Sequence, residues 1–315
     1  MEERENLNIK LKCWGGDWDL PTIDIDSLSV ICYAKIRNVP VKIEKTLPKN
    51  TITGTLPELE VKEIVYSNPL RIIGKLRKEG YNADFHLTED ENADTLAFLA
   101  YIKQKLKPAI LYTLWLDAGN YTKVIRPAYA TVCGFPWSLW YPSKIRKAVE
   151  QSIYQAKGGT DYEELHDIEK RLYRDAHECL NVLEKKLGNN EYFFGKSPST
   201  FDAVLYGHLS ILLKAPLVST EIKNHLNACK NLTGLCFRLD QMYFPKVLTS
   251  SSPSKSVENS PEKLLKRDQI ITIAAALGAM IVYALTSGVL THKSSKLAER
   301  IQNHGSAIEE FDTID

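Results

Sequence analysis

Apolar and polar positions alternate near the start of the chain, with one helical pattern between them. Leu7–Leu11 and Val41–Thr46 alternate as half-buried strands do. Residues 26–36 instead carry apolar side chains on adjoining helical turns, and Asp26 or Ser27 is positioned to cap that helix. The pattern predicts a β-α-β unit.

A second pair of strands follows. Leu56–Val61 and Glu63–Tyr66 predict a hairpin with Pro57 at its entry, and Asn68–Arg77 predicts a helix. A β-α-β unit followed by β-β-α is typical of a thioredoxin-like domain, which we expect over residues 7–85.

The next segment, 86–248, has mainly helical periodicity. Asp94–Lys107 places its apolar residues along one side of a helix. Thr160–Glu163 and Ser199–Asp202 have the spacing of capping boxes, and each opens a long apolar-striped segment. We therefore expect an all-α second domain and an α+β protein overall.

The end of the chain predicts a membrane anchor. Residues 249–266 are rich in serine and proline and read as a flexible linker. Ile270–Leu290 contains 21 residues without a charge, which as a helix spans the roughly 30 Å hydrocarbon layer. With no signal peptide at the N-terminus, we expect a transmembrane anchor over 267–292, inserted after synthesis. A polar tail, 293–315, would cross the bilayer while the body stays in the cytosol.

Composition excludes several function classes. Lys plus Arg number 40 and Asp plus Glu 39, so the net charge of +1 argues against a general nucleic-acid binder. The six cysteines are scattered without CxxC spacing, which indicates reduced thiols and neither a zinc site nor a disulfide framework. The sequence predicts no metal and no cofactor.

The layout resembles the glutathione-transferase fold. Pro57 lies where that fold keeps a cis-proline, and Phe193–Leu209 resembles the capping box at the core of its helical domain. A conjugating enzyme of that fold needs a hydroxyl or thiol near the start of the first helix. Here Cys13 precedes the turn and Thr22 is poorly placed, so we predict no catalytic residue. Weak ligand binding at Pro57 and Ser67 stays open.

One aromatic run lies between two prolines, and its large side chains are Phe135, Trp137, Trp140 and Tyr141. Such a run cannot form a long regular helix. One interpretation is a loop that packs its aromatic rings onto the helical bundle. The other is an exposed patch for a partner protein or for the bilayer surface, where Trp and Tyr are favoured.

Four segments resemble the metaxin signature: Cys13–Ile36, Tyr81–Phe98, Leu172–Leu180 and Tyr192–Gly195. Together with the anchor, the likeness covers nearly the whole chain and is greatest to metaxins with a C-terminal anchor. One departure is Asp19, where a small residue is expected.

The resemblance implies a mitochondrial outer-membrane protein with its body in the cytosol and its tail in the intermembrane space. It implies a non-enzymatic role in protein import and in β-barrel assembly by the sorting and assembly machinery. The implied partners are a second metaxin and the β-barrel insertase, besides the lipid bilayer. Two alternatives stay open: an adaptor that couples mitochondria to motor proteins, and a glutathione-dependent enzyme.

Overall fold

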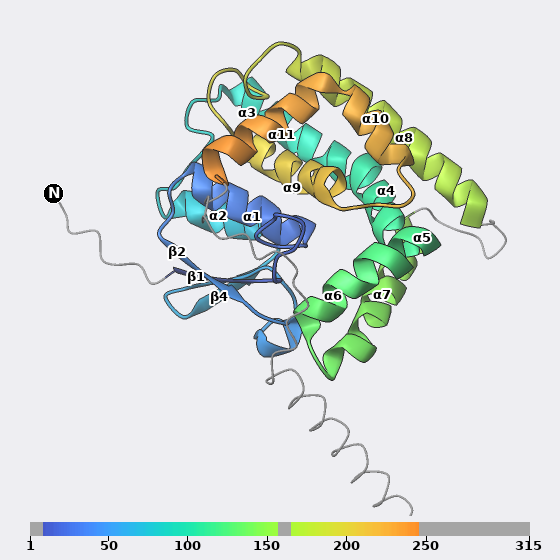
Figure 1. Cartoon of the computed structure of the whole chain (residues 1–315). Coiled ribbons are helices and arrows are strands. Elements are labelled where there is room, and N and C mark those ends of the chain that lie inside the picture. Colours follow the sequence, from blue (N-terminus) through green and yellow to red (C-terminus); the bar gives the residue numbers. More distant parts are fainter. Residues whose placement is uncertain (1–8, 157–164, 246–315) are drawn as a thin grey trace, which may run out of the picture. The chain divides into compact units, whose positions relative to one another are not determined.

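The computed structural model describes residues 9–156 and 165–245 (Figure 1). Within these residues, no helix is both long and apolar enough to cross a membrane. Several predicted features lie outside the described residues: the linker 249–266, the anchor 267–292 with its ends Ile270 and Leu290, the tail 293–315 and the Thr160–Glu163 capping box.

A four-stranded mixed sheet forms the first part of the fold. The strands run in the order β2-β1-β3-β4, with β1 parallel to β2 and antiparallel to β3. Helix α1 connects β1 to β2, and helix α2 follows β4; both lie on the same side of the sheet (Figure 1). The predicted β-α-β and β-β-α order is confirmed. The bounds are β1 Ile9–Cys13, α1 Ile25–Ile36, β2 Val41–Lys45, β3 Glu58–Val61, β4 Ile64–Ser67 and α2 Pro69–Lys78.

Strand β2 is less buried than its alternating sequence predicts. Only Val41 is partly buried, and the other four residues of the strand are exposed. Because β2 is an edge strand paired with β1 alone, its side chains keep access to solvent. The prediction of a half-buried strand is wrong here.

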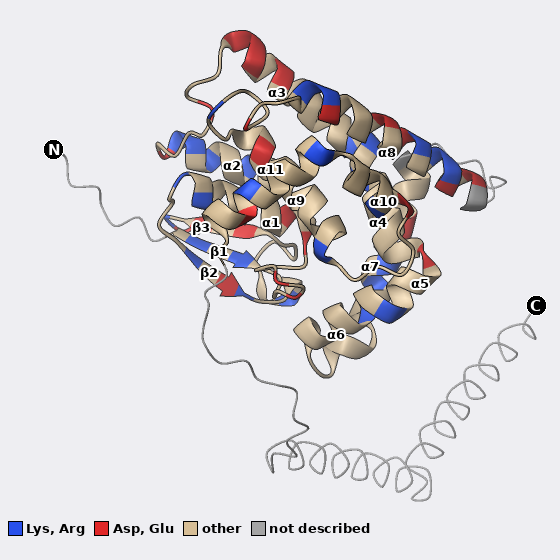
Figure 2. Cartoon of the chain, turned by 45° about the horizontal axis from the view of Figure 1, so that its top comes forward, with Lys and Arg blue, Asp and Glu red and all other residues tan. Residues whose placement is uncertain are grey.

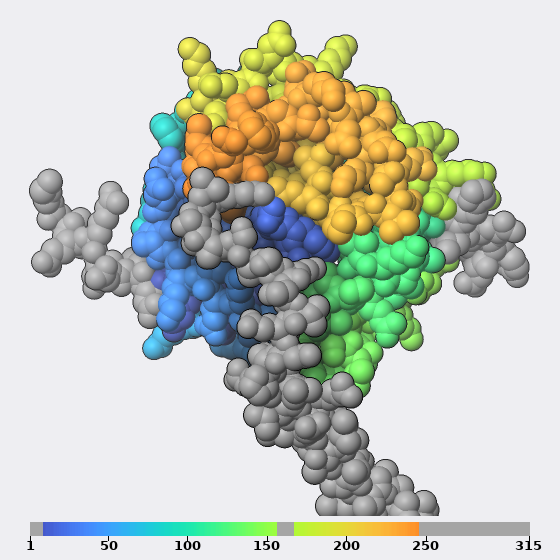
Figure 3. Space-filling model, in the orientation of Figure 1, coloured from blue at the N-terminus to red at the C-terminus, as the bar shows by residue number. Residues whose placement is uncertain are grey.

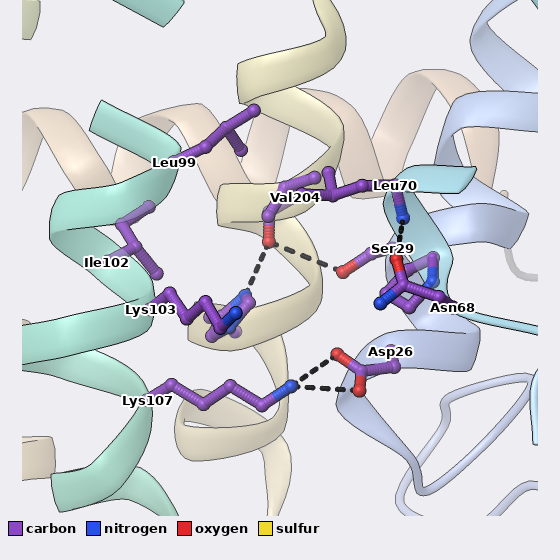
Figure 4. A pocket seen from close by; sticks show the side chains of 11 residues that line it. Asp26, Ser29, Asn68, Leu70, Leu99, Ile102, Lys103, Lys107 and Val204 are labelled. Atoms are coloured by element: carbon purple, nitrogen blue, oxygen red, sulfur yellow. Dashed lines mark hydrogen bonds and ion pairs between the residues drawn. The ribbon is translucent and has the colours of Figure 1, made fainter. Parts of the chain in front are cut away.

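The cap of α1 also differs from expectation. The side chain of Asp24 accepts hydrogen bonds from the Ser27 amide at 2.8 Å and the Ser27 hydroxyl at 2.6 Å. Asp24, and neither Asp26 nor Ser27, is therefore the N-cap. Asp26 lies in the first turn of α1, and its carboxylate forms an ion pair with Lys107 (Figure 4).

Helices make up the second part of the fold. The helix predicted from Asp94 begins earlier, at Glu89, because Thr88 and Glu91 form a capping box that the apolar pattern does not reveal. The bounds are α3 Glu89–Tyr101, α4 Lys107–Leu111, α5 Ala118–Asn120, α6 Arg126–Cys133, α7 Tyr141–Ala156, α8 Leu165–Leu187, α9 Thr200–Lys214, α10 Glu221–Ala228 and α11 Lys230–Tyr243.

The chain between α3 and α6 is interrupted by widened, π-helical turns, among them Ile102–Leu106 and Tyr121–Ile125. Pro108 and Pro127 lie two residues beyond these turns. Since proline has no N–H to donate to the preceding turn, the regular ladder of hydrogen bonds cannot continue through it. The long helical pattern thus bends instead of forming one straight rod.

Helix α9 joins the two parts. A Cβ added at Gly207 would lie 2.1 Å from the Ser29 hydroxyl of α1 and 2.8 Å from the Ile25 carbonyl oxygen, so only glycine permits this approach. Nearby, the buried carboxylate of Asp84 accepts hydrogen bonds from the amide and hydroxyl of Thr200 at 2.7 and 2.6 Å. One continuous apolar core therefore runs through the sheet and the helical bundle. In Figure 3 the yellow-to-orange surface of the last helices lies directly against dark-blue atoms from the first part of the chain.

The second predicted capping box is confirmed. The buried carboxylate of Asp202 accepts hydrogen bonds from the Ser199 amide and hydroxyl and from the Phe193 amide, all within 2.8 Å. The ring of Phe193 lies 4.2 Å from that of Phe201, measured between centroids. This cluster fixes the start of α9 in the core.

Candidate functional site

The loop after β1 lies where the transferase fold places its reactive group. Cys13 is fully buried, and burial raises the pKa of its thiol to about 12, with a further upward contribution from Asp24. Trp14 is buried as well, with its ring edge-on to Tyr129 and Tyr141 at centroid distances of 5.2 and 5.7 Å. Neither side chain offers a nucleophile to solvent.

The hydroxyl groups near this loop are also enclosed. Thr22 is fully buried, and its hydroxyl accepts a hydrogen bond from the Asp24 amide at 3.3 Å. The Tyr129 hydroxyl donates to the Ile23 carbonyl at 3.4 Å, and burial keeps the pKa of Tyr129 well above its ordinary range. These groups hold the loop, and none is poised to stabilise a thiolate.

Pro57 and Ser67 are brought together, as the transferase fold requires. The Leu56–Pro57 peptide bond is cis, which confirms that expectation. The next residue, Glu58, pairs with Ser67 across β3 and β4. The Glu58 side chain is buried and accepts from Lys12 at 3.0 Å and from Thr53. The structure thus places Pro57 beside the residue paired with Ser67, while ligand binding at Pro57 and Ser67 stays a prediction.

The reactivity of the cysteine thiols tests whether this loop could act in catalysis. All six are buried free thiols, and among the described residues no group of three His, Cys, Asp or Glu side chains could hold a metal ion. We expect a thiol reagent at about pH 8 to modify none of them rapidly in the folded protein and all six after denaturation, because the thiolate reacts and burial suppresses it.

Absorbance titration with a disulfide reagent, before and after denaturant, measures this. Cys13→Ser serves as the matched variant. Rapid modification of one thiol that disappears in Cys13→Ser would contradict the enclosed loop and favour the enzyme alternative.

The aromatic run has a divided structure. Phe135 and Trp140 are 67% and 47% exposed. Trp137 and Tyr141 are partly buried against the core, with Trp137 in a short 3-10 turn and Tyr141 at the start of α7. The rings of Trp137 and Trp140 meet edge to face at 5.2 Å. We call these four residues the aromatic patch. Trp137 and Tyr141 pack on the core, and Phe135 and Trp140 project outward.

The surroundings of the aromatic patch are basic. The ammonium group of Lys49 lies 3.6 Å from the centre of the Trp137 ring, and that of Lys144 lies 5.8 Å from the Tyr141 ring. In Figure 2 the ribbon of α6, just before the patch, is almost entirely tan, whereas α8 is densely charged. The aromatic patch is therefore bordered by the basic side chains of Lys49 and Lys144.

Two further residues belong to this surface and were not predicted. Leu139 is 63% exposed and extends the patch. Its position inside the aromatic run could have indicated this from the sequence. Lys49 comes from the turn before β3, and nothing in the sequence indicates that it reaches Trp137. Beside Tyr141, a groove of about 360 Å³ runs between Gly54 and α7.

Comparison with solved structures shows the fold. A glutathione S-transferase of Ceriporiopsis subvermispora, solved with glutathione, aligns with a TM-score of 0.51 over 78% of this chain and all of its own, at 12% identity. A glutathione transferase of Phanerochaete chrysosporium also aligns with a TM-score of 0.51, over 75% of this chain and 98% of its own, at 10% identity. The fold is glutathione-transferase-like.

Sequence comparison shows the family. Residues 27–146 match a family described as "Outer mitochondrial membrane transport complex protein", and residues 176–239 match the glutathione S-transferase C-terminal domain. Metaxin-1 of Mus musculus is 38% identical over 290 residues, which cover 90% of this chain and 91% of that protein. Metaxin-3 of Danio rerio is 37% identical over 80% of each chain. The chain therefore belongs to the metaxin family.

Proposed function

We propose that this protein is a non-catalytic component of an outer mitochondrial membrane transport complex. Its body faces the cytosol, the segment 267–292 anchors it in the outer membrane, and the tail 293–315 reaches the intermembrane space. In this role it supports protein import and the assembly of β-barrel proteins. A second metaxin and the β-barrel insertase are its partners.

A contrast between two surfaces carries this proposal. In the transferase-like loop, the thiol of Cys13 and the hydroxyls of Thr22 and Tyr129 are enclosed. In the aromatic patch, Phe135 and Trp140 are exposed, and Lys49 and Lys144 lie beside the neighbouring rings of Trp137 and Tyr141. Exposed aromatic rings are costly on a solvated surface and are enriched at protein interfaces. This contrast favours docking to a partner protein over catalysis in the transferase-like loop.

Tethering explains how docking of modest affinity would suffice. A protein anchored in the same membrane as its partner meets it at an effective concentration that a short flexible linker sets in the millimolar range. The serine-rich segment 249–266 would act as that linker. In the aromatic patch, the rings of Phe135 and Trp140 project outward. Tryptophan is among the residue types that most often dominate binding energy.

Deletion of residues 267–315 tests the role of the anchor. We expect the deleted protein to be absent from mitochondria that have been washed at alkaline pH and to lose its co-purification with the outer-membrane transport complex. A matched control replaces Ile270–Leu290 with an unrelated apolar span of equal length and should restore both.

Normal co-purification of the deleted protein would contradict recruitment through the anchor. The level of β-barrel proteins in cells that lack this chain distinguishes the assembly role from the motor-adaptor alternative. A fall in that level supports the assembly role, and an unchanged level together with altered mitochondrial transport along microtubules would favour the motor adaptor.

A further inference from the structure

Strand β2 has a free edge. Among the described residues it pairs with β1 alone, and Figure 2 shows it at the edge of the sheet, beyond β1. A free edge presents unpaired backbone N–H and C=O groups to a further strand, so native proteins usually protect it with proline, a bulge or charged side chains. Val41–Lys45 contains no proline, and its register with β1 is continuous. Its charged side chains therefore decide which strand this edge accepts.

The hydrogen bonds to β1 show which backbone groups of β2 face outward. The Thr46 amide donates to the Cys13 carbonyl of β1 at 2.9 Å. Successive residues of a strand direct their N–H and C=O groups to opposite sides, so Glu44 also faces β1, whereas Ile43 and Lys45 face the free edge. Ile43 is the central residue of β2, and its backbone groups are left for another strand.

The side chains of β2 alternate in charge on one face of the sheet. Lys42 and Glu44 pair in register with Lys10 and Lys12 of β1, on the face that does not pack against α1. This order of charges complements itself when two such strands run antiparallel about Ile43, because each Lys42 then lies opposite a Glu44. Opposite charges that face each other across two strands stabilise the pair.

A groove beside β2 exposes apolar surface on the other face. Its volume is about 550 Å³, and it lies between β2, the end of α1 and the end of α11. Val41 and Ile43 line it, as does Met242, which is 62% exposed. Among the described residues of its lining only Lys35 is charged, and the Lys35 ammonium group lies 5.1 Å from the centre of the Phe244 ring. A further strand at the free edge would cover part of this apolar surface.

We propose that β2 pairs with β2 of a second copy of this chain, antiparallel and centred on Ile43. The two Ile43 residues exchange both of their backbone hydrogen bonds across a two-fold axis. Lys42 of each copy meets Glu44 of the other on one face, and the two Ile43 side chains meet on the face of the groove. The two four-stranded sheets thereby become one continuous sheet.

The charges of β2 also select this register. A shift of the second copy by two residues, in either direction, places two Glu44 or two Lys42 side chains opposite each other, and like charges in that position are destabilising. A pair of five-residue strands is a small interface, and small interfaces are weak in solution. Association should therefore depend measurably on two ion pairs.

Charge reversal in the detergent-solubilised full chain tests this proposal. Lys42→Glu and Glu44→Lys each place like charges opposite each other in a pair of identical chains, so each should weaken self-association by about tenfold or more. A mixture of the two single variants restores both attractive pairs and should associate like the native chain, as should the double variant. Lys123→Glu, at an exposed lysine of the turn Tyr121–Ile125, is the matched control and should change nothing.

Sedimentation velocity at roughly 100 µM chain suits an interface of this size. A native chain that stays monomeric at this concentration would overturn the proposal. Equal association of the native chain and both single variants would overturn it as well, because the contact would then lie elsewhere, for example in the segment 267–292.

Amide hydrogen exchange of the native chain gives a second readout that needs no variant. A higher chain concentration should slow exchange at Ile43 and Lys45, whose amides face the free edge. Exchange at Glu44 should stay unchanged, because its amide already faces β1. Exchange at Ile43 that does not depend on concentration would contradict pairing through β2.

Discussion

Replacement of Gly207 by valine is expected to destabilise the body by about 3 kcal/mol or more. A side chain at this position would meet the Ser29 hydroxyl at 2.1 Å and backbone atoms of α1 at 2.8 Å. The hydroxyl can rotate, but the backbone of Ile25 and Ser29 cannot yield without separating α1 from α9. Chemical unfolding of the detergent-solubilised full chain measures the loss.

A matched glycine elsewhere gives the opposite expectation. A Cβ at Gly74 of α2 would meet nothing within 4 Å. Gly74→Ala should therefore stabilise the protein by roughly 0.5–1 kcal/mol through helix propensity. If Gly207→Val were as stable as the native protein, the close packing of α1 against α9 would be wrong.

The double variant Phe135→Ser, Trp140→Ser is expected to reduce co-purification with the outer-membrane transport complex by about tenfold or more, because exposed aromatic anchors dominate binding energy. Phe135 projects outward, and Trp140 loses its edge-to-face contact with Trp137, so the free energy of unfolding should fall by only about 1 kcal/mol. Trp137 and Tyr141 are left intact, since they pack on the core. Quantitative affinity purification from solubilised mitochondria provides the measurement.

A control variant separates this effect from general loss of apolar surface. Leu96 and Phe237 are 68% and 63% exposed, similar to the pair above, but belong to α3 and α11. Leu96→Ser, Phe237→Ser should retain normal co-purification. Equal losses in the two double variants, or normal recovery of the first, would speak against a docking role for the aromatic patch.

Much of the architecture is predictable from local patterns, because caps and alternation are local effects. The Ser199–Asp202 box fixes the start of α9 by short-range chemistry and is confirmed, whereas cis Pro57 was expected only from the resemblance to the transferase fold. The cap of α1 is not predictable in this way: Asp24, Asp26 and Ser27 all have suitable side chains. The helix begins at Ile25, so Asp24 caps it, while Asp26 lies inside α1 and forms an ion pair with Lys107, which is distant in the sequence.

The sites are less predictable than the fold. The aromatic run is visible in sequence, but which rings project depends on contacts such as those of Trp137 with Lys49. The close approach of Gly207 in α9 to Ser29 and Ile25 in α1 also has no local signature, because these residues are far apart in the sequence. A histidine in the apolar sequence of α9 reads as a core residue. The structure agrees with that reading, since His208 is 4% exposed and its Nδ1 lies 2.8 Å from the Val204 carbonyl oxygen.

The most direct test of the central claim, a docking body held at the outer membrane, is site-specific photo-crosslinking in intact mitochondria. A photoreactive phenylalanine analogue in place of Trp140 should form adducts with integral outer-membrane proteins. The same analogue in place of Leu96, exposed on α3, should form none. Adducts from position 96 with none from position 140 would contradict the account.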